Sequence, residues 1–314
     1  MRSSLALIAT AGLVAVALTG CAQTPAPEAA SGGSSDVIEV SGDFGKTPRV
    51  DFPTPVSPEE TQCTEIIAGE GDRVVAGQQT LVGYAVYNGA TGDKIQATGF
   101  GDEDPVPLLV SDKTLPGLAK GLTCAREGSR VAVVVPPADA FGDEGNAALG
   151  VDGDTSLVFV VDVQRTFPLR ADGAPRLTRD GFPAVVLAPD GRPGITVPKA
   201  EPSGQTEVEV LREGSGEVVE SGDQVVVHYT GVLWEDGTVF DSSWEKGGPT
   251  SFIVADGEGS QVVPGFSKAI IGQKVGSQVG VIVAPEDGYG ADGNGSTIRG
   301  DATLFFVIDI LGVL

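Results

Sequence analysis

The sequence has few of the residues that bind metals or act as nucleophiles and bases. It contains one His and three Cys in 314 residues, with no CxxC pair and no EF-hand loop. We therefore predict no metal site and no cofactor. Basic residues are also scarce, because 20 Lys and Arg stand against 43 Asp and Glu, a formal net charge of −23. This charge argues against a nucleic-acid partner, which is bound through Lys and Arg at phosphates, and against a basic membrane-binding patch.

Glycine and short apolar runs are abundant instead. The chain has 45 Gly and 21 Pro, and 41% of its residues are hydrophobic while 20% are charged. These proportions indicate a globular chain, and Val-rich runs separated by turn residues favour strands over helices. The length is enough for two domains, each with its own core.

The N-terminus is typical of a targeting segment. Arg2 precedes an apolar run over residues 5–18, and Leu-Thr-Gly-Cys follows, ending at Cys21. This tetrapeptide resembles a bacterial lipobox, whose Cys is lipidated and becomes the mature N-terminus; the alternative is an ordinary secretory signal with a chance Cys. We expect a lipoprotein signal peptide over residues 1–20 and a flexible tether rich in Pro, Ala, Gly and Ser over residues 21–36. The mature protein is then expected to be extracytoplasmic and anchored to the cell membrane by lipid on Cys21.

Two further cysteines, Cys63 and Cys124, lie in the first half of the chain. Disulfides persist in exported proteins, so a bridge between Cys63 and Cys124 is the natural hypothesis. Two buried free thiols are the alternative.

An internal repeat organises the rest of the chain. A shift of 145 residues places Tyr84 on Tyr229, a shift of 148 places LPGLAKGL on VPGFSKAI, and a shift of 147 places DTSLVFVVDV on DATLFFVIDI. Blocks that recur in the same order predict the same domain twice. We place these domains at residues 37–166 and 187–314, with a connector at 167–186.

Each copy is predicted to be an antiparallel sheet with one short helix. Residues 224–244 of the second copy form a candidate hairpin, since Val-rich and aromatic strands flank the turn Glu-Asp-Gly. A helix is expected where apolar residues recur at i, i+3 and i+4 between Pro-Gly and a terminal Gly. The expected elements are strands at 207–212, 224–233, 250–254, 278–283 and 302–311, and a helix at 266–271.

The second copy resembles the FKBP-type peptidyl-prolyl cis/trans isomerases. It carries VVVHYTG, DGTVFDSS, QVVPGF, VGSQVGVIVAPEDGYG and ATLFFVIDIL in the family order. The resemblance implies an α+β fold of two tandem domains, each a twisted antiparallel half-barrel sheet around one short helix. It also implies isomerisation of X-Pro bonds, assistance to the folding of exported proteins, and two classes of ligand: proline-containing segments of unfolded or exported proteins, and macrolide inhibitors.

The resemblance also implies the pocket residues. Tyr289 and the backbone N–H of Val263 match hydrogen-bond donors to the ligand, and Asp241 matches an acid at the rim. Two departures stand out: Phe266 replaces a usual Trp at the floor, and Thr250 replaces a usual aromatic on the wall. The full implied set is Tyr229, Phe240, Asp241, Val262, Val263, Phe266, Tyr289, Ile298 and Phe306.

Each of these residues, taken singly, has an ordinary structural interpretation as core or turn. The only His, His228, alternates with Tyr229 along a strand and is expected to be structural rather than a base.

The first copy departs from the family pattern at four pocket positions: Ile95 replaces Phe240, Gln96 replaces Asp241, Leu118 replaces Phe266 and Phe141 replaces Tyr289. We therefore expect catalysis in the C-terminal domain and weak or no activity in the first. The alternative function is a non-catalytic chaperone or surface binding protein that uses both domains as scaffolds.

Overall fold

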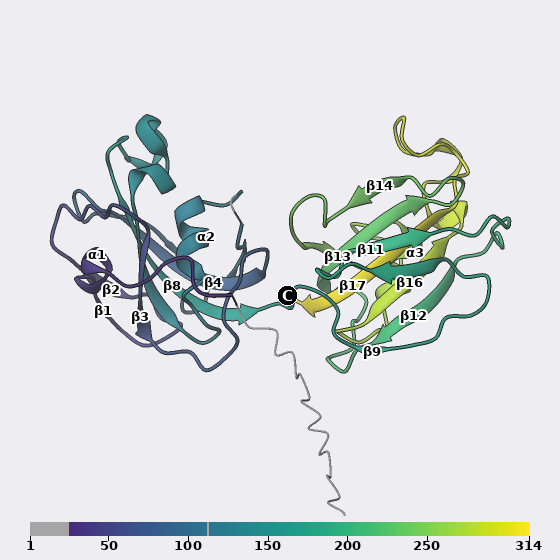
Figure 1. Cartoon of the computed structure of the whole chain (residues 1–314), viewed down its shortest axis with the longest axis horizontal. Coiled ribbons are helices and arrows are strands. Elements are labelled where there is room, and N and C mark those ends of the chain that lie inside the picture. Colours follow the sequence, from purple (N-terminus) through teal and green to yellow (C-terminus); the bar gives the residue numbers. More distant parts are fainter. Residues whose placement is uncertain (1–24, 112) are drawn as a thin grey trace, which may run out of the picture.

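A computed structural model describes residues 25–111 and 113–314. It shows two lobes side by side, which are joined by the segment that follows β8 (Leu157–Thr166) (Figure 1). The predicted signal peptide and Cys21 lie outside the described residues. Within the described part of the chain, no helix is both long and apolar enough to cross a membrane.

The first lobe is built on a six-stranded sheet of order β3-β7-β8-β4-β5, with β6 paired to β4, and every pairing is antiparallel. The helix α2 packs against this sheet. The elements are α1 (Gly33–Asp36), β1 (Glu39–Ser41), β2 (Arg49–Asp51), β3 (Gln62–Ile67), β4 (Gln79–Asn88), β5 (Lys94–Thr98), β6 (Val106–Leu109), α2 (Pro116–Leu122), β7 (Arg130–Val135) and β8.

The second lobe repeats this arrangement. Its seven-stranded antiparallel sheet has the order β14-β13-β17-β16-β12-β9, with β15 paired to β13. Six of these strands have the same order as those of the first lobe and confirm the predicted repeat, while β9 is an addition at the edge of the second sheet. The elements are β9 (Ala174–Pro175), β10 (Ala184–Leu187), β11 (Pro193–Thr196), β12 (Glu207–Glu213), β13 (Gln224–Leu233), β14 (Val239–Ser242), β15 (Thr250–Ile253), α3 (Pro264–Ile270), β16 (Gln278–Val283) and β17 (Leu304–Val313).

The predicted strands match these bounds closely, and two elements are displaced. The last strand begins and ends two residues later than predicted. The helix α3 begins at Pro264, because proline suits the first helical position, where no backbone N–H is needed. Gly272 follows the helix with φ +83°, the conformation expected of a terminal glycine.

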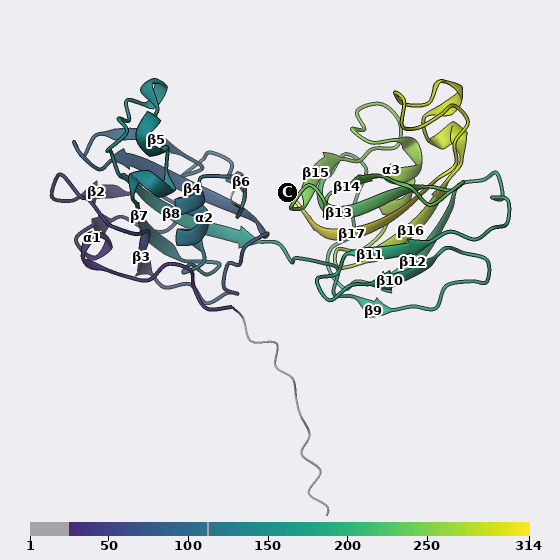
Figure 2. The same cartoon turned by 45° about the horizontal axis from the view of Figure 1, so that its top comes forward.

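Each sheet is covered on both faces. In the second lobe α3 lies on one face, and the hairpin β10–β11 packs on the other through Val185 and Ile195 (Figure 2). In the first lobe the hairpin β1–β2 takes the same position through Val40 and Val50. This double cover explains why every residue of β7 and β16 is buried, as their nearly unbroken apolar sequences require.

The flexible tether predicted for residues 21–36 is wrong for the part from Glu28 onward. The backbone N–H of Glu28 donates to the hydroxyl of Thr123 at 2.7 Å, Ala29 is buried in the core, and residues 33–36 form α1. Small Ala, Gly and Ser side chains let this segment lie close to the first lobe, where its backbone groups find partners.

The connector at residues 167–186 is packed on the second lobe. The backbone N–H of Ala171 donates to Asp309 Oδ2 at 2.9 Å, and the ring of Phe182 packs edge-on against Phe305 with 5.4 Å between centroids. β10 crosses the boundary predicted at residue 187. The second lobe therefore takes in most of the connector.

A small apolar cluster joins the lobes. Phe167 is 1% exposed and packs with Val226 and Leu311 of the second lobe. The Arg165 guanidinium lies over the Phe167 ring and donates to the carbonyl of Val313 at 2.8 Å. The C-terminus consequently lies at the junction (Figure 1).

The predicted disulfide between Cys63 and Cys124 is confirmed. It joins β3 to the segment after α2 across 6.5 Å between Cα atoms. The bridge therefore ties the helix of the first lobe to the sheet beneath it.

Candidate active site

Aromatic side chains surround a cavity of about 380 Å³ in the second lobe. Phe266 of α3 forms its floor and meets Tyr229 of β13 and Phe306 of β17 edge-on, at 5.8 and 5.3 Å between ring centroids. Phe240 of β14 packs on Phe306 in the same way at 5.4 Å. Edge-to-face contacts of this kind hold the rings in defined orientations. The walls are therefore rigid as well as apolar.

Most of the predicted site residues come together here. The lining includes Tyr229, Phe240, Asp241, Val262, Val263, Phe266, Tyr289 and Phe306. Ile298 is the exception, and its assignment to the pocket wall is wrong. It is 3% exposed and packs in the core cluster of this lobe, but it is not among the residues that line the cavity.

Phe252 also lines the cavity, and sequence reasoning missed it. Its ring lies 5.9 Å from Tyr229 and 6.1 Å from Phe266. Thr250, which was expected to stand in the wall in place of a usual aromatic, is two residues earlier on β15 and so lies on the same face of that strand. The alternation of side chains along β15 is the signal that could have identified Phe252 from the sequence.

The rim carries a polar network. The Tyr229 hydroxyl donates to Asp241 Oδ2 at 2.8 Å, and Lys246 Nζ pairs with Asp241 Oδ1 at 2.5 Å. Burial raises the pKa of Tyr229, and its hydrogen bond to Asp241 raises it further. The phenol consequently stays protonated and acts as a donor at neutral pH.

Two further donors belong to residues that line the cavity. Val263 immediately precedes α3, and its backbone N–H makes no hydrogen bond within the described residues. The half-buried Tyr289 presents its hydroxyl from the turn after β16. The Ser260 hydroxyl orders the loop before Val263, because it donates to the carbonyl of Val262 at 2.9 Å. The cavity can thus offer hydrogen bonds to a carbonyl group bound among apolar walls.

An ion pair ties the turn that carries Tyr289 to the helix. Lys268 Nζ lies 2.7 and 2.8 Å from the two oxygens of Asp287, and this hydrogen bond lowers the pKa of Asp287. Lys120 and Asp139 form the same pair at the equivalent positions of the first lobe, at 2.6 Å. The pair therefore belongs to the shared scaffold and does not distinguish the two cavities.

His228 has the structural role expected of it. It lies on β13 beside Tyr229 but faces away from the cavity, stacked on Trp244 with 3.8 Å between ring centroids. Its Nδ1 is 2.8 Å from the Ser243 hydroxyl. Burial lowers the pKa of His228 to about 4, so the imidazole is neutral at physiological pH.

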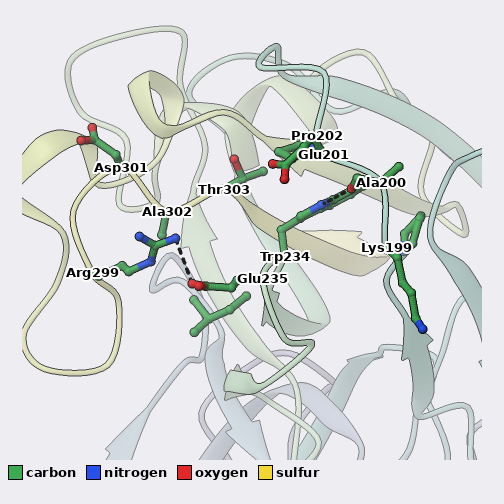
Figure 3. A pocket seen from close by; sticks show the side chains of 12 residues that line it. Lys199, Ala200, Glu201, Pro202, Trp234, Glu235, Arg299, Asp301, Ala302 and Thr303 are labelled. Atoms are coloured by element: carbon green, nitrogen blue, oxygen red, sulfur yellow. Dashed lines mark hydrogen bonds and ion pairs between the residues drawn. The ribbon is translucent and has the colours of Figure 1, made fainter.

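A second cavity in this lobe, of about 360 Å³, contains none of the predicted site residues. Figure 3 shows two polar pairs among the residues that line it. Arg299 contacts Glu235 at 2.9 Å, and the indole N–H of Trp234 donates to the carbonyl of Ala200 at 3.1 Å. The exposed ion pair between Arg299 and Glu235 contributes little free energy. The aromatic cavity remains the candidate site.

The first lobe has a cavity at the position equivalent to the aromatic one. It measures about 550 Å³, and its lining includes Tyr84, Ile95, Gln96, Leu118 and Phe141. All of the substitutions that distinguish the first copy are therefore in the cavity wall. The acid at the rim has become an amide, and the Tyr at the turn has become a Phe.

Comparisons with known proteins identify the family of the chain. The family model described as "FKBP-type peptidyl-prolyl cis-trans isomerase" matches residues 71–164 and 216–311. An "FK506-binding protein" of Streptomyces anulatus is 35% identical over 123 residues, which are 39% of this chain and 97% of that protein. "FK506-binding protein 1" of Dictyostelium discoideum is 37% identical over 105 residues, 33% of this chain and 94% of that protein.

A solved structure of the three FKBP domains of wheat FKBP73 aligns with 81% of this chain and 94% of that one, at 21% identity and a TM-score of 0.36.

Proposed function

The chain belongs to the FKBP-type peptidyl-prolyl cis-trans isomerase family, and we propose that the aromatic cavity of its second lobe is where X-Pro bonds are isomerised. The observation that carries this proposal is the combination, in one cavity, of an apolar floor at Phe266 with donors at Tyr289 and Val263. The equivalent cavity of the first lobe has Leu118 at the floor and Phe141 in place of the Tyr289 donor.

The reaction requires no nucleophile or proton transfer. Rotation about an X-Pro bond crosses a barrier of roughly 18–20 kcal/mol, because twisting the bond breaks amide resonance. A planar amide is more polar than a twisted one. Transfer of the prolyl amide from water to aromatic walls therefore destabilises the planar ground state more than the twisted transition state.

The donors then act on the carbonyl groups that flank the twisted bond. A hydroxyl at Tyr289 and an N–H at Val263 can hold the substrate backbone while the proline ring lies against Phe266. The Tyr229 hydroxyl and the Lys246 ammonium both contact Asp241, and these contacts fix the position of its carboxylate at the rim. We assign it the role of orienting the substrate where the bond rotates.

Variants of the full chain test this assignment by a cis-to-trans assay on a short prolyl peptide. Tyr289→Phe should lower kcat/KM about tenfold, the effect of one lost hydrogen bond in the transition state. Asp241→Ala should lower it by a similar factor, because the Tyr229 hydroxyl and Lys246 lose the partner that orders the rim. The matched control is Gln96→Ala, which changes the residue equivalent to Asp241 in the first lobe and should leave the rate unchanged. A loss of rate in Gln96→Ala with an active Asp241→Ala would place catalysis in the first lobe instead.

We further propose that the protein acts on exported proteins while anchored to the cell membrane through Cys21. The lipobox-like sequence supports the anchor, and the Cys63–Cys124 bridge supports an oxidising, extracytoplasmic compartment. Labelling of cells with radioactive palmitate should mark the wild type and not Cys21→Ser. Membrane fractionation should find the variant in the soluble fraction, whereas a Cys21→Ser protein that stays with the membrane would contradict the anchor.

A further inference from the structure

The cavity of the first lobe is larger than that of the second and is lined differently. Its volume is about 550 Å³ against about 380 Å³. Branched aliphatic side chains at Ile95 and Leu118 replace two phenyl rings, while Phe159 keeps the position of Phe306. The loss of the prolyl-site residues has therefore left a wider cavity rather than a collapsed one.

No charged side chain lines this cavity. Its polar groups are already engaged: Gln96 Nε2 donates to the Tyr84 hydroxyl at 3.1 Å, and the Thr114 hydroxyl donates to the carbonyl of Leu109 at 2.6 Å. A charged ligand would lose its hydration here without gaining a partner. The ligand that fits is neutral and apolar.

An exposed leucine stands at the mouth. Leu149 ends a short turn, lines the cavity and is 40% exposed. Together with Ile95 it also lines the adjoining surface depression. Among the described residues, it is the one exposed large apolar side chain that borders either of the two equivalent cavities. An apolar segment that enters the cavity would cover it.

We propose that the first-lobe cavity binds apolar segments of non-native polypeptides through Leu, Ile or Phe side chains, with no requirement for proline. This inference rests in part on the proposed function, because a client held at the first lobe presents its prolyl bonds to the second lobe at high effective concentration. The volume lies within the range of cavities that enclose an organic ligand. The missing acid and tyrosine explain why the cavity binds without catalysing.

Binding is tested with the full chain and a fluorescein-labelled, Leu-rich peptide that contains no proline. Leu149→Asp puts a charge at the mouth on an exposed position, where folding is not at risk, and should weaken binding about tenfold or more. The matched control is Leu177→Asp, the same substitution at a residue that is 99% exposed and lies outside both cavities. A peptide that does not bind, or that binds Leu149→Asp as tightly as Leu177→Asp, would overturn the proposal.

A second measurement separates this proposal from the proposed isomerase. An unfolded protein client should be isomerised more efficiently by the wild type than by Leu149→Asp, while a short prolyl peptide is turned over equally by both. Tyr289→Phe should slow both reactions and keep the affinity for the proline-free peptide. If Tyr289→Phe binds that peptide as the wild type does but isomerises at full rate, the catalytic assignment fails and the binding site stands.

Discussion

The buried imidazole of His228 predicts how the stability of the second lobe depends on pH. The side chain is 4% exposed, stacked on Trp244 and bonded through Nδ1 to Ser243. Burial lowers its pKa from 6.5 to about 4, although the nearby carboxylate of Asp190 acts in the opposite direction. Well above pH 6.5 the imidazole is neutral in both the folded and the unfolded chain, so its titration does not change the free energy of unfolding.

As the pH falls below 6.5, the unfolded chain binds a proton at His228 and the folded chain does not. Stability is therefore lost progressively between pH 6.5 and 4. With these two pKa values, the free energy of unfolding should fall by about 2 kcal/mol between pH 7 and pH 5 on account of this residue alone. Carboxylates that titrate in the same range add their own changes.

Urea denaturation at pH 7 and pH 5, followed by tryptophan fluorescence, provides the assay. The two Trp residues of the chain, Trp234 and Trp244, both belong to the second lobe, so the signal reports that lobe within the full protein. His228→Asn loses stacking at every pH, but its stability should depend less on pH than that of the wild type by about 2 kcal/mol, and the carboxylate contributions cancel in the difference. Equal pH dependence in the two proteins would refute the account of His228 as a buried neutral group.

Two other predictions concern the disulfide and the floor of the cavity. Replacing both Cys63 and Cys124 by Ala should lower the free energy of unfolding of the first lobe by about 4 kcal/mol, because the unfolded chain gains the entropy of a loop of 61 residues. Isomerase activity should stay unchanged. Calorimetry measures the unfolding transition, and an unchanged transition would contradict the prediction. Phe266→Trp should bind a short prolyl peptide about tenfold more tightly, because an indole offers more apolar surface at the floor. Isothermal titration calorimetry measures the affinity, and equal affinity would exclude the floor as its determinant.

Much of the fold follows from local patterns. The repeat places the same strands and helix in both halves, and the run at 224–233 forms a strand with the predicted bounds. Period-2 alternation likewise separated Tyr229, which faces the cavity, from His228, which faces away. These predictions succeeded because the formation of a strand, and the side of the sheet to which each of its side chains points, depend on neighbouring residues.

Other features depend on residues far apart in the chain. Nothing near Val185 or Ile195 indicates that their hairpin covers the outer face of the sheet, where it meets residues such as Phe305. The segment at Glu28–Ala29 has the composition of a tether, yet it finds a partner 95 residues away at Thr123. Such docking is decided by complementary surfaces that form only after the sheet has folded.

The sequence alone predicted the doubled domain, the order of the sequence blocks that it shares with a known family, the disulfide and most of the aromatic cavity wall. Those features arise from hydrophobic periodicity and from blocks of residues in a recognisable order. Tertiary structure decided that Phe252 and not Ile298 lines the cavity, that Tyr229 and Lys246 both engage Asp241, and that the first lobe keeps a wider, uncharged cavity. The physical reason is that cavity shape and hydrogen-bond partners depend on how side chains from distant strands pack together, and sequence spacing does not specify this.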